Sequence, residues 1–161
     1  MTGSSLEARL DRVEAELAIR AILVDYAAFL DARDYAPYVA LFTPDGEWEN
    51  HNGHYKGRDA IVAMLTSQLG PDGSPNPNSY HLITNIRVTI DGDRATASSR
   101  FHFVMRDRES GSPRIILGGT YDDQLLRQRD GDWQIRRRLA TDLMPSPEEW
   151  NKMMAERMKQ G

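Results

Sequence analysis

Asp31 and His81 are the two residues whose types and positions best suit proton-transfer chemistry. Asp31 lies four residues after Ala27 and eight after Leu23, so it continues the apolar stripe of a predicted helix. A carboxylate on a buried face needs a partner, because burying it alone is costly. His81 opens a strand in the stretch "NPNSYHLITN", and alternation places it on the more polar strand face. Spacing alone equally fits Asp31 as a helix cap, or as a partner of the nearby Arg33, and His81 as a surface histidine.

The other histidines are weaker candidates. His51 and His54 flank the turn at Gly53 and are expected to be exposed. With Glu49 they suggest a metal site, but no third ligand stands at a diagnostic spacing, so we expect no metal. His102 falls on the strand face that also carries arginines, which indicates a surface or a subunit interface. The chain has no cysteine, so disulfides, thiolate metal sites and cysteine nucleophiles are excluded.

The composition is typical of a globular protein that lies neither on nucleic acid nor on a membrane. The chain has 161 residues, 40% of them hydrophobic and 27% charged, and a net charge of −4. The arginines at 136–138 alternate across a strand, so they form no basic patch. No apolar run approaches the roughly 20 residues of a membrane span, and the charged N-terminus differs from a secretory signal. We therefore expect a cytoplasmic location and no nucleic-acid or membrane partner.

Helical periodicity dominates the first half of the chain and a period of two dominates the second. Helices are predicted over 5–33, over a short segment near Pro37 and over 58–69, with a hairpin around Gly53 between the last two. After a ten-residue loop come strands at 80–90, 95–106, 114–128 and 133–143, and a last helix that Ser146 and Glu149 can cap. The pattern predicts an α+β fold in which helices cover one face of a twisted antiparallel sheet. Such a layer can curl into a cone whose mouth is a pocket.

The order of these segments resembles a known family. The motifs are "DYAAFLDARDYAPYVALFTPDGEWE", "YKGRDAIVAML", "YHLITN", "DGDRATASS" and "RDGDWQIRR". They resemble the SnoaL-like branch of the nuclear transport factor 2-like superfamily over about residues 8–142. The resemblance implies one domain over 1–161, with a C-terminal helix at 146–161. It also implies a cone-shaped, curved antiparallel sheet packed on three N-terminal helices.

Within that superfamily the functional likeness is to scytalone dehydratase and hexachlorocyclohexane dehydrochlorinase. Both place an aspartate at the end of the first long helix and a histidine at the start of the first strand after the third helix, and Asp31 and His81 match. The likeness implies an Asp–His dyad that uses no metal and no organic cofactor. There are departures. Met105 stands about where scytalone dehydratase has a second active-site histidine, and Tyr26 about where the dehydrochlorinase has a lysine.

The dyad implies a lyase in which His81 removes a proton from a substrate carbon while Asp31 fixes and stabilises the imidazole ring. Loss of water, halide or formaldehyde would follow. Tyr26 is expected to donate to a substrate oxygen. Five further residues are predicted to contact the substrate, three in an apolar wall and two at a polar end. For these residues and for Tyr26, packing in the core explains the residue types equally well. The wall is Trp48, Phe103 and Met105, and the polar end is Asn85 and Asp122.

Two other functions fit the same family. One is a polyketide cyclase or isomerase of the SnoaL type, and the other is the non-catalytic small subunit of an aromatic-ring dioxygenase. In the enzyme case we expect a small hydrophobic or aromatic substrate. We also expect a homo-oligomer, a trimer by likeness to the two dyad enzymes or otherwise a dimer, with Val104, Ile116 and Leu126 on the uncovered sheet face. The stripe of Trp150, Met153, Met154 and Met158 on the last helix fits either a lid over the cavity or simple docking.

Overall fold

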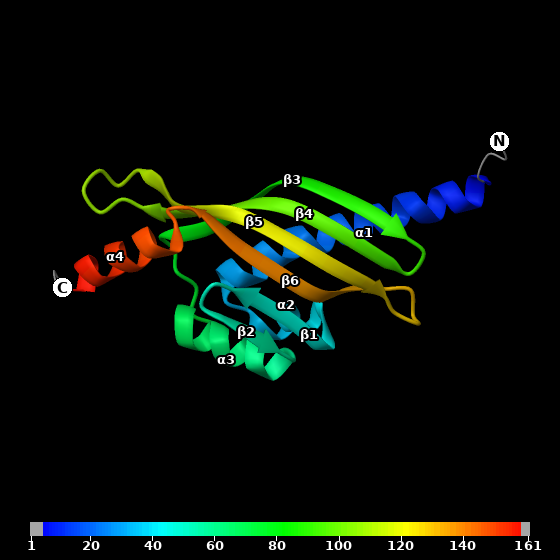
Figure 1. Ribbon diagram of the computed structural model, residues 1–161, viewed down its shortest axis with the longest axis horizontal. Helices are drawn as coiled ribbons and strands as arrows, with labels where there is room; N and C mark the ends of the chain where they lie inside the picture. Colours follow the sequence, from blue (N-terminus) through cyan, green and yellow to red (C-terminus); the bar gives the residue numbers. More distant parts are fainter. Residues whose placement is uncertain (1–4, 159–161) are drawn as a thin grey trace.

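The computed structural model describes residues 5–158. Figure 1 shows helices gathered on one side of a long, curved sheet, with the first and last helices extending past opposite ends of it. In chain order the elements are α1 (Leu6–Ala32), α2 (Tyr35–Ala40), β1 (Phe42–Asn50), β2 (Gly53–Lys56), α3 (Arg58–Leu69), β3 (Ser79–Asp91), β4 (Arg94–Arg106), β5 (Pro113–Arg127), β6 (Trp133–Met144) and α4 (Pro147–Met158). The predicted α+β class is confirmed.

The sheet is mixed rather than antiparallel throughout. Its strand order is β2-β1-β6-β5-β4-β3. Strands β3 to β6 form the predicted antiparallel meander, but β1 runs parallel to β6. The two strands are far apart in the sequence, so no hairpin fixes their relative direction. Alternation of apolar residues carries no information on direction, which is why the sequence did not predict the parallel pair.

Helix α1 has two halves with different surroundings. Ser5 caps its start, with Oγ accepting a hydrogen bond from the Ala8 N–H at 3.2 Å. The second half packs onto the sheet, whereas the first half extends beyond it (Figure 1). The apolar stripe of the first half is therefore exposed to solvent by 54–79%; it consists of Leu6, Leu10, Val13 and Leu17.

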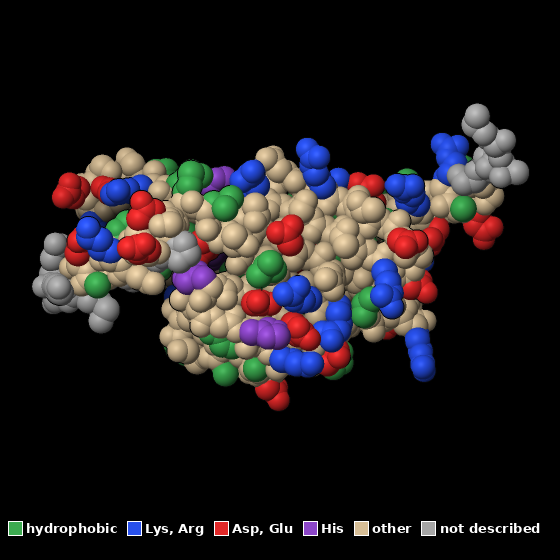
Figure 2. Space-filling view, viewed as in Figure 1, with side chains coloured by type: hydrophobic (Ala, Val, Ile, Leu, Met, Phe, Trp, Pro, Cys, Tyr) green, Lys and Arg blue, Asp and Glu red, His purple; other side chains and the backbone are tan. Residues whose placement is uncertain are grey.

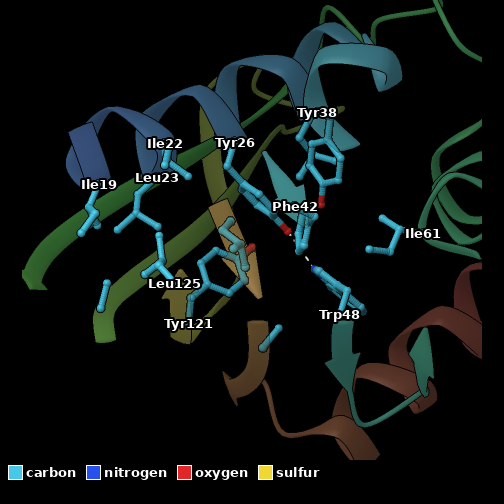
Figure 3. Close-up of a cluster of buried hydrophobic side chains, with 14 of the residues drawn as sticks. Ile19, Ile22, Leu23, Tyr26, Tyr38, Phe42, Trp48, Ile61, Tyr121 and Leu125 are labelled. Carbon is cyan, nitrogen blue, oxygen red and sulfur yellow. Dashed lines mark hydrogen bonds between the residues drawn. The ribbon is translucent and has the colours of Figure 1, made fainter. Parts of the chain in front are cut away.

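The core fills the space between the helices and the concave side of the sheet (Figure 3). All three N-terminal helices contribute to it. Its largest fully buried side chains include an arginine; they are Arg138, Tyr26, Tyr38, Phe42, Ile19, Leu23, Ile61, Leu125 and Ile135. Burial of this much apolar surface is the main force that holds the sheet against the helices.

Arg138 is a charged residue at the centre of this core. Its Nε and second guanidinium nitrogen donate to the two carboxylate oxygens of Asp123, at 2.6 and 2.8 Å. The guanidinium lies 3.7 Å from the ring centre of Tyr26 and 4.4 Å from that of Tyr121. Burial alone would lower the pKa of Arg138, but the Asp123 carboxylate outweighs burial and raises it. A register shift beside Arg136 turns Arg138 inward.

The outer surface of β1, β2 and β6 carries paired charges. Glu47 contacts Arg136 at 3.1 Å and His54 at 3.0 Å, and Arg137 contacts Glu49 at 2.6 Å. Figure 2 shows acidic and basic side chains interspersed over the visible face. None of the helices within residues 5–158 combines the length and the apolar character that crossing a membrane requires.

Helix α4 begins with the predicted capping box. The Glu149 N–H donates to Ser146 Oγ at 3.3 Å, and the Ser146 N–H donates to Glu149 Oε2 at 2.8 Å. The helix projects away from the sheet (Figure 1). Of its predicted apolar stripe, Trp150 is half-buried and Met153 is exposed. The side chains of Met154 and Met158 lie outside the described part of the chain.

Candidate active site

Asp31 and His81 meet as the sequence predicted. Asp31 Oδ1 lies 2.6 Å from Nδ1 of His81, and Asp31 Oδ2 accepts a hydrogen bond from the His81 backbone N–H at 2.9 Å. The carboxylate thus holds both the ring and the main chain of the histidine. The side chain of Asp31 is 25% exposed and that of His81 is 15% exposed, so both remain accessible from a cavity. No hydrogen bond from within residues 5–158 occupies Nε2 of His81.

Local structure explains why the two side chains meet. Asp31 stands on the last turn of α1, which ends where Arg33 adopts a left-handed conformation with φ of 50°. The loop between α3 and β3 is tied to this end of α1, since the Gly73 N–H donates to the Arg33 carbonyl oxygen at 2.8 Å. That loop delivers the chain to the start of β3, where His81 stacks on Phe103 with ring centres 4.7 Å apart. The ring is therefore fixed by a hydrogen bond and by an aromatic contact.

The dyad opens into a cavity of about 560 Å³, a size typical of small-molecule sites. Six of the eight predicted site residues line it: Tyr26, Asp31, Trp48, His81, Phe103 and Met105. The walls between these residues are mostly apolar, with contributions from Leu30, Met64, Leu65, Phe101 and Leu117. This arrangement suits a hydrophobic ligand that presents a reactive carbon to His81.

Asn85 and Asp122 do not line the cavity, so their predicted place at its polar end is wrong. A register shift between Thr84 and Arg87 places Asn85 at a bulge, with φ of 54° and its side chain exposed. The bulge inverts the alternation, so that His81 shares its face with Ile86 rather than with Asn85. Asp122 is exposed because its neighbours on β5, Tyr121 and Asp123, are the ones that point into the core.

Three tyrosines line the cavity, Tyr26, Tyr38 and Tyr121, and the sequence indicated only Tyr26. Tyr26 Oη accepts a hydrogen bond from Trp48 Nε1 at 2.9 Å, so its own proton is free to be donated (Figure 3). Tyr38 is fully buried, and its hydroxyl has no hydrogen-bond partner within residues 5–158. Burial raises the pKa of Tyr38 well above the usual value, so its hydroxyl stays protonated. Tyr38 was missed because it lies in a six-residue helix with no diagnostic motif.

A second histidine–carboxylate pair also lines the cavity. Nδ1 of His51 lies 2.9 Å from Oδ2 of Asp142. The expectation that His51 is exposed holds for the residue as a whole, but its side chain is only 22% exposed and faces the cavity. Burial raises the pKa of Asp142, and the neighbouring His51 opposes that effect. No sequence signal links the two residues, because the parallel pairing of β1 with β6 brings them together.

The residues considered for a metal are engaged elsewhere. His51 pairs with Asp142, His54 with Glu47, and Glu49 with Arg137. Within residues 5–158 no three histidine or acidic side chains converge on a point where a cation could bind.

The "GGTYDD" stretch has a packing role. A side chain at Gly119 would clash with the carbonyl oxygen of Thr141, and its Cβ would stand 2.7 Å from Cε1 of Phe101. The missing side chain lets the Phe101 ring lie flat against β5, where it stacks on Tyr121 at 4.4 Å. This stacked pair forms part of the apolar cavity wall.

Comparison with known proteins places this architecture in a family. Residues 11–139 match the SnoaL-like domain. The chain belongs to the SnoaL-like family. A relative of this SnoaL-like protein, the uncharacterized protein Rv2910c of Mycobacterium tuberculosis, is 33% identical over 132 residues, which are 80% of this chain and 86% of the relative.

Solved structures agree with the nuclear transport factor 2-like fold. An NTF2-like protein with a cystatin-like fold from Novosphingobium aromaticivorans is 28% identical, with a TM-score of 0.75 over 89% of this chain and 91% of that one. A candidate scytalone dehydratase from the same organism is 26% identical, with a TM-score of 0.68 over 83% and 87%. LinA shares the fold at 22% identity, with a TM-score of 0.70 over 84% of this chain and 90% of LinA. The β subunit of a candidate aromatic-ring-hydroxylating dioxygenase shares the fold at 19% identity, with a TM-score of 0.66 over 81% and 90%.

Proposed function

We propose that this SnoaL-like protein is a cofactor-independent lyase that acts on a small hydrophobic or aromatic substrate. The observation that carries the proposal is the 2.6 Å contact between Asp31 Oδ1 and His81 Nδ1 at the wall of a largely apolar cavity. A histidine whose Nδ1 faces a carboxylate carries its proton there in the neutral state. The lone pair on Nε2 is then available as a base.

The proposed reaction begins with proton transfer from a substrate C–H bond to Nε2 of His81. The electrons of that bond form a carbon–carbon double bond as the bond to a leaving group on the adjacent carbon breaks. The leaving group departs with the electron pair of its own bond: a halide leaves as the anion, and a hydroxyl group takes the proton back from the imidazolium of His81 and leaves as water. Asp31 stabilises the imidazolium that forms. Tyr26 donates a hydrogen bond to an oxygen of the substrate, where negative charge develops.

The choice of a lyase rests on the dyad together with the likeness to a candidate scytalone dehydratase. A SnoaL-type cyclase or isomerase shares the first proton transfer and differs in the fate of the carbanion, which closes a ring or is reprotonated. A non-catalytic subunit, the role suggested by the dioxygenase neighbour, has no use for a fixed imidazole in a cavity. The dyad therefore favours catalysis over a structural role.

Two measurements test the proposal. Aryl ketones with acidic α-protons are incubated in D2O with the protein, and proton NMR follows deuterium incorporation; β-hydroxy aryl ketones are then screened for loss of water. We expect exchange with the wild type and none above background with His81→Ala. His102→Ala is the matched control, because His102 does not line the cavity. Equal exchange by a folded His81→Ala variant would refute the mechanism.

We also propose that the protein forms a homo-oligomer through apolar surface that its own helices leave uncovered. On the outer face of β3 and β5, Tyr80, Leu82 and Ile115 are 44%, 42% and 58% exposed. Of the residues predicted on this face, Val104 pairs with Tyr80 and Ile115 but is itself buried. Leu126 alternates with the core residue Leu125 and is half-buried, whereas Ile116 lines the cavity instead. A trimer follows from the likeness to the dyad enzymes, and a dimer is the alternative. Light scattering at micromolar concentration tests this, and a monomer would contradict it.

A further inference from the structure

His51 and Asp142 are a polar pair in the cavity that the proposed elimination does not use. His51 lies in the turn after β1, and Asp142 lies near the end of β6. Their side chains are 22% and 8% exposed, and the two interacting atoms are 2.9 Å apart. Since Asp142 occupies Nδ1, the other ring nitrogen of His51 is the one left to meet a ligand. No group within residues 5–158 hydrogen-bonds to it.

The pair stands across the cavity from the dyad. Asp142 is the Cα partner of Gly119 on β5, Gly119 pairs with Phe101 on β4, and Phe101 pairs with Ile83 on β3. Ile83 is two residues along β3 from His81. Three strand spacings of about 4.8 Å separate Asp142 from β3, or about 14 Å measured along the sheet. Curvature of the sheet and the inward reach of the side chains shorten the free gap.

The surface between the two pairs is apolar. Phe101, Phe103 and Leu117 lie between Asp142 and His81 in the sheet, and all three line the cavity. A ligand that touches both pairs therefore rests its middle on aromatic and aliphatic side chains. Such a ligand can place one hydrogen-bonding atom at each end, facing the dyad and the pair of His51 and Asp142.

The carboxylate of Asp142 is held where burial works against its charge. Burial is the largest influence on Asp142 and disfavours its charged form despite the nearby imidazole. Desolvating an ion pair commonly offsets the attraction between its charges. A polar pair kept in a cavity at such a cost is typical of a site that binds or reacts with something.

We propose that His51, positioned by Asp142, binds an oxygen atom of the substrate at the end of the cavity opposite His81. This inference rests on the proposed function, because it concerns the same substrate. It narrows the substrate class to elongated molecules, of two rings or equivalent length, with an apolar middle and an oxygen function at each end.

The test uses two matched probes, 2,6-dihydroxynaphthalene and 2-naphthol, which differ by one hydroxyl at the far end. Binding is measured by calorimetry with the wild type, His51→Ala and His54→Ala. The chain has only four histidines, so 15N-histidine NMR assigns and follows each ring. His54→Ala is the control, because His54 is only three residues away, on β2, but pairs with Glu47 outside the cavity.

We expect the wild type to bind the diol about tenfold more tightly than 2-naphthol, and the ring signals of both His51 and His81 to shift. His51→Ala should lose most of that preference, whereas His54→Ala should keep it. Equal affinity of the wild type for the two probes, or no binding of either, would overturn the inference. If His51→Ala does not fold, the test rests on whether the His51 ring signal of the wild type shifts when the diol binds.

The pattern of ring shifts separates this inference from the proposed function. A shift at His81 alone refutes the role of His51 and leaves the dyad mechanism standing. A shift at His51 alone supports a binding role for His51 and counts against His81 as the base.

Discussion

The carboxylate of Asp31 holds His81 at two points, with one oxygen 2.6 Å from Nδ1 and the other accepting from the backbone N–H at 2.9 Å. A single contact would leave the ring free to rotate about its side-chain bonds, whereas the double contact ties the helix end to the strand that carries the ring. The stacked Phe103 removes a further degree of freedom. The geometry therefore fixes both the tautomer and the direction of the free ring nitrogen.

His81→Ala and Asp31→Asn should separate the base from the group that orients it. His81→Ala should abolish turnover, because no other imidazole is held by Asp31. Asp31→Asn keeps the shape but removes the negative charge, so we expect a loss of about 10²- to 10⁴-fold in kcat. Steady-state kinetics on a substrate from the screen, with circular dichroism as the folding control, measure both effects. An Asp31→Asn enzyme of near wild-type kcat would contradict the role of the carboxylate.

The dyad could be predicted from the sequence because each partner lies on a regular element with a clear period. Asp31 follows the buried stripe of α1, and His81 begins β3. Only the family likeness indicated that the two elements meet, since they are 50 residues apart in the chain.

Irregular and non-local structure explains why some residues were placed wrongly or overlooked in the sequence. The bulge at Asn85 inverts one strand face, and the register shift beside Arg136 buries Arg138. A bulge adds one residue to a strand without any required residue type, so alternation predicts the wrong face beyond it. The pair of His51 and Asp142 depends on the parallel contact between β1 and β6, which leaves no periodic signal.

Tyr26→Phe and Tyr38→Phe form a matched pair of variants. Tyr26→Phe leaves the buried Nε1 of Trp48 without its acceptor, which should cost about 1–3 kcal/mol of unfolding free energy. It should also lower kcat by about 10²-fold if Tyr26 binds the reacting oxygen. Tyr38→Phe removes a hydroxyl that has no partner within residues 5–158, so stability should be unchanged or slightly higher. Urea denaturation checks both, and a large destabilisation by Tyr38→Phe would contradict this account.

Asp142→Asn should stabilise the protein at neutral pH. Burial raises the pKa of Asp142 above the ordinary value of 3.8. A carboxyl group whose pKa is higher in the folded than in the unfolded state stabilises the fold while it is protonated, and this contribution is complete at pH values below the unfolded-state pKa. The contribution is lost as the pH rises through the folded-state pKa. Asparagine cannot ionise, so the stability difference between variant and wild type should grow in the variant's favour from about pH 4 to pH 7. Denaturation curves across this range provide the measurement. A variant less stable than the wild type at pH 7 would show that the His51 contact outweighs the cost of burial.

Removal of α4 should weaken ligand binding more than it weakens the fold. Trp150 is half-buried and lines the cavity, whereas the other described side chains of the helix are exposed. Their removal uncovers little apolar surface, so a chain that ends at Ser146 should melt within a few degrees of the full chain. The cavity loses one aromatic wall and gains access to water, so KM should rise several-fold; Trp150→Ala should reproduce this rise. Met153→Ala is the control, since Met153 is 44% exposed and does not line the cavity. A large fall in melting temperature with an unchanged rate per folded molecule would identify α4 as a structural support and exclude a lid.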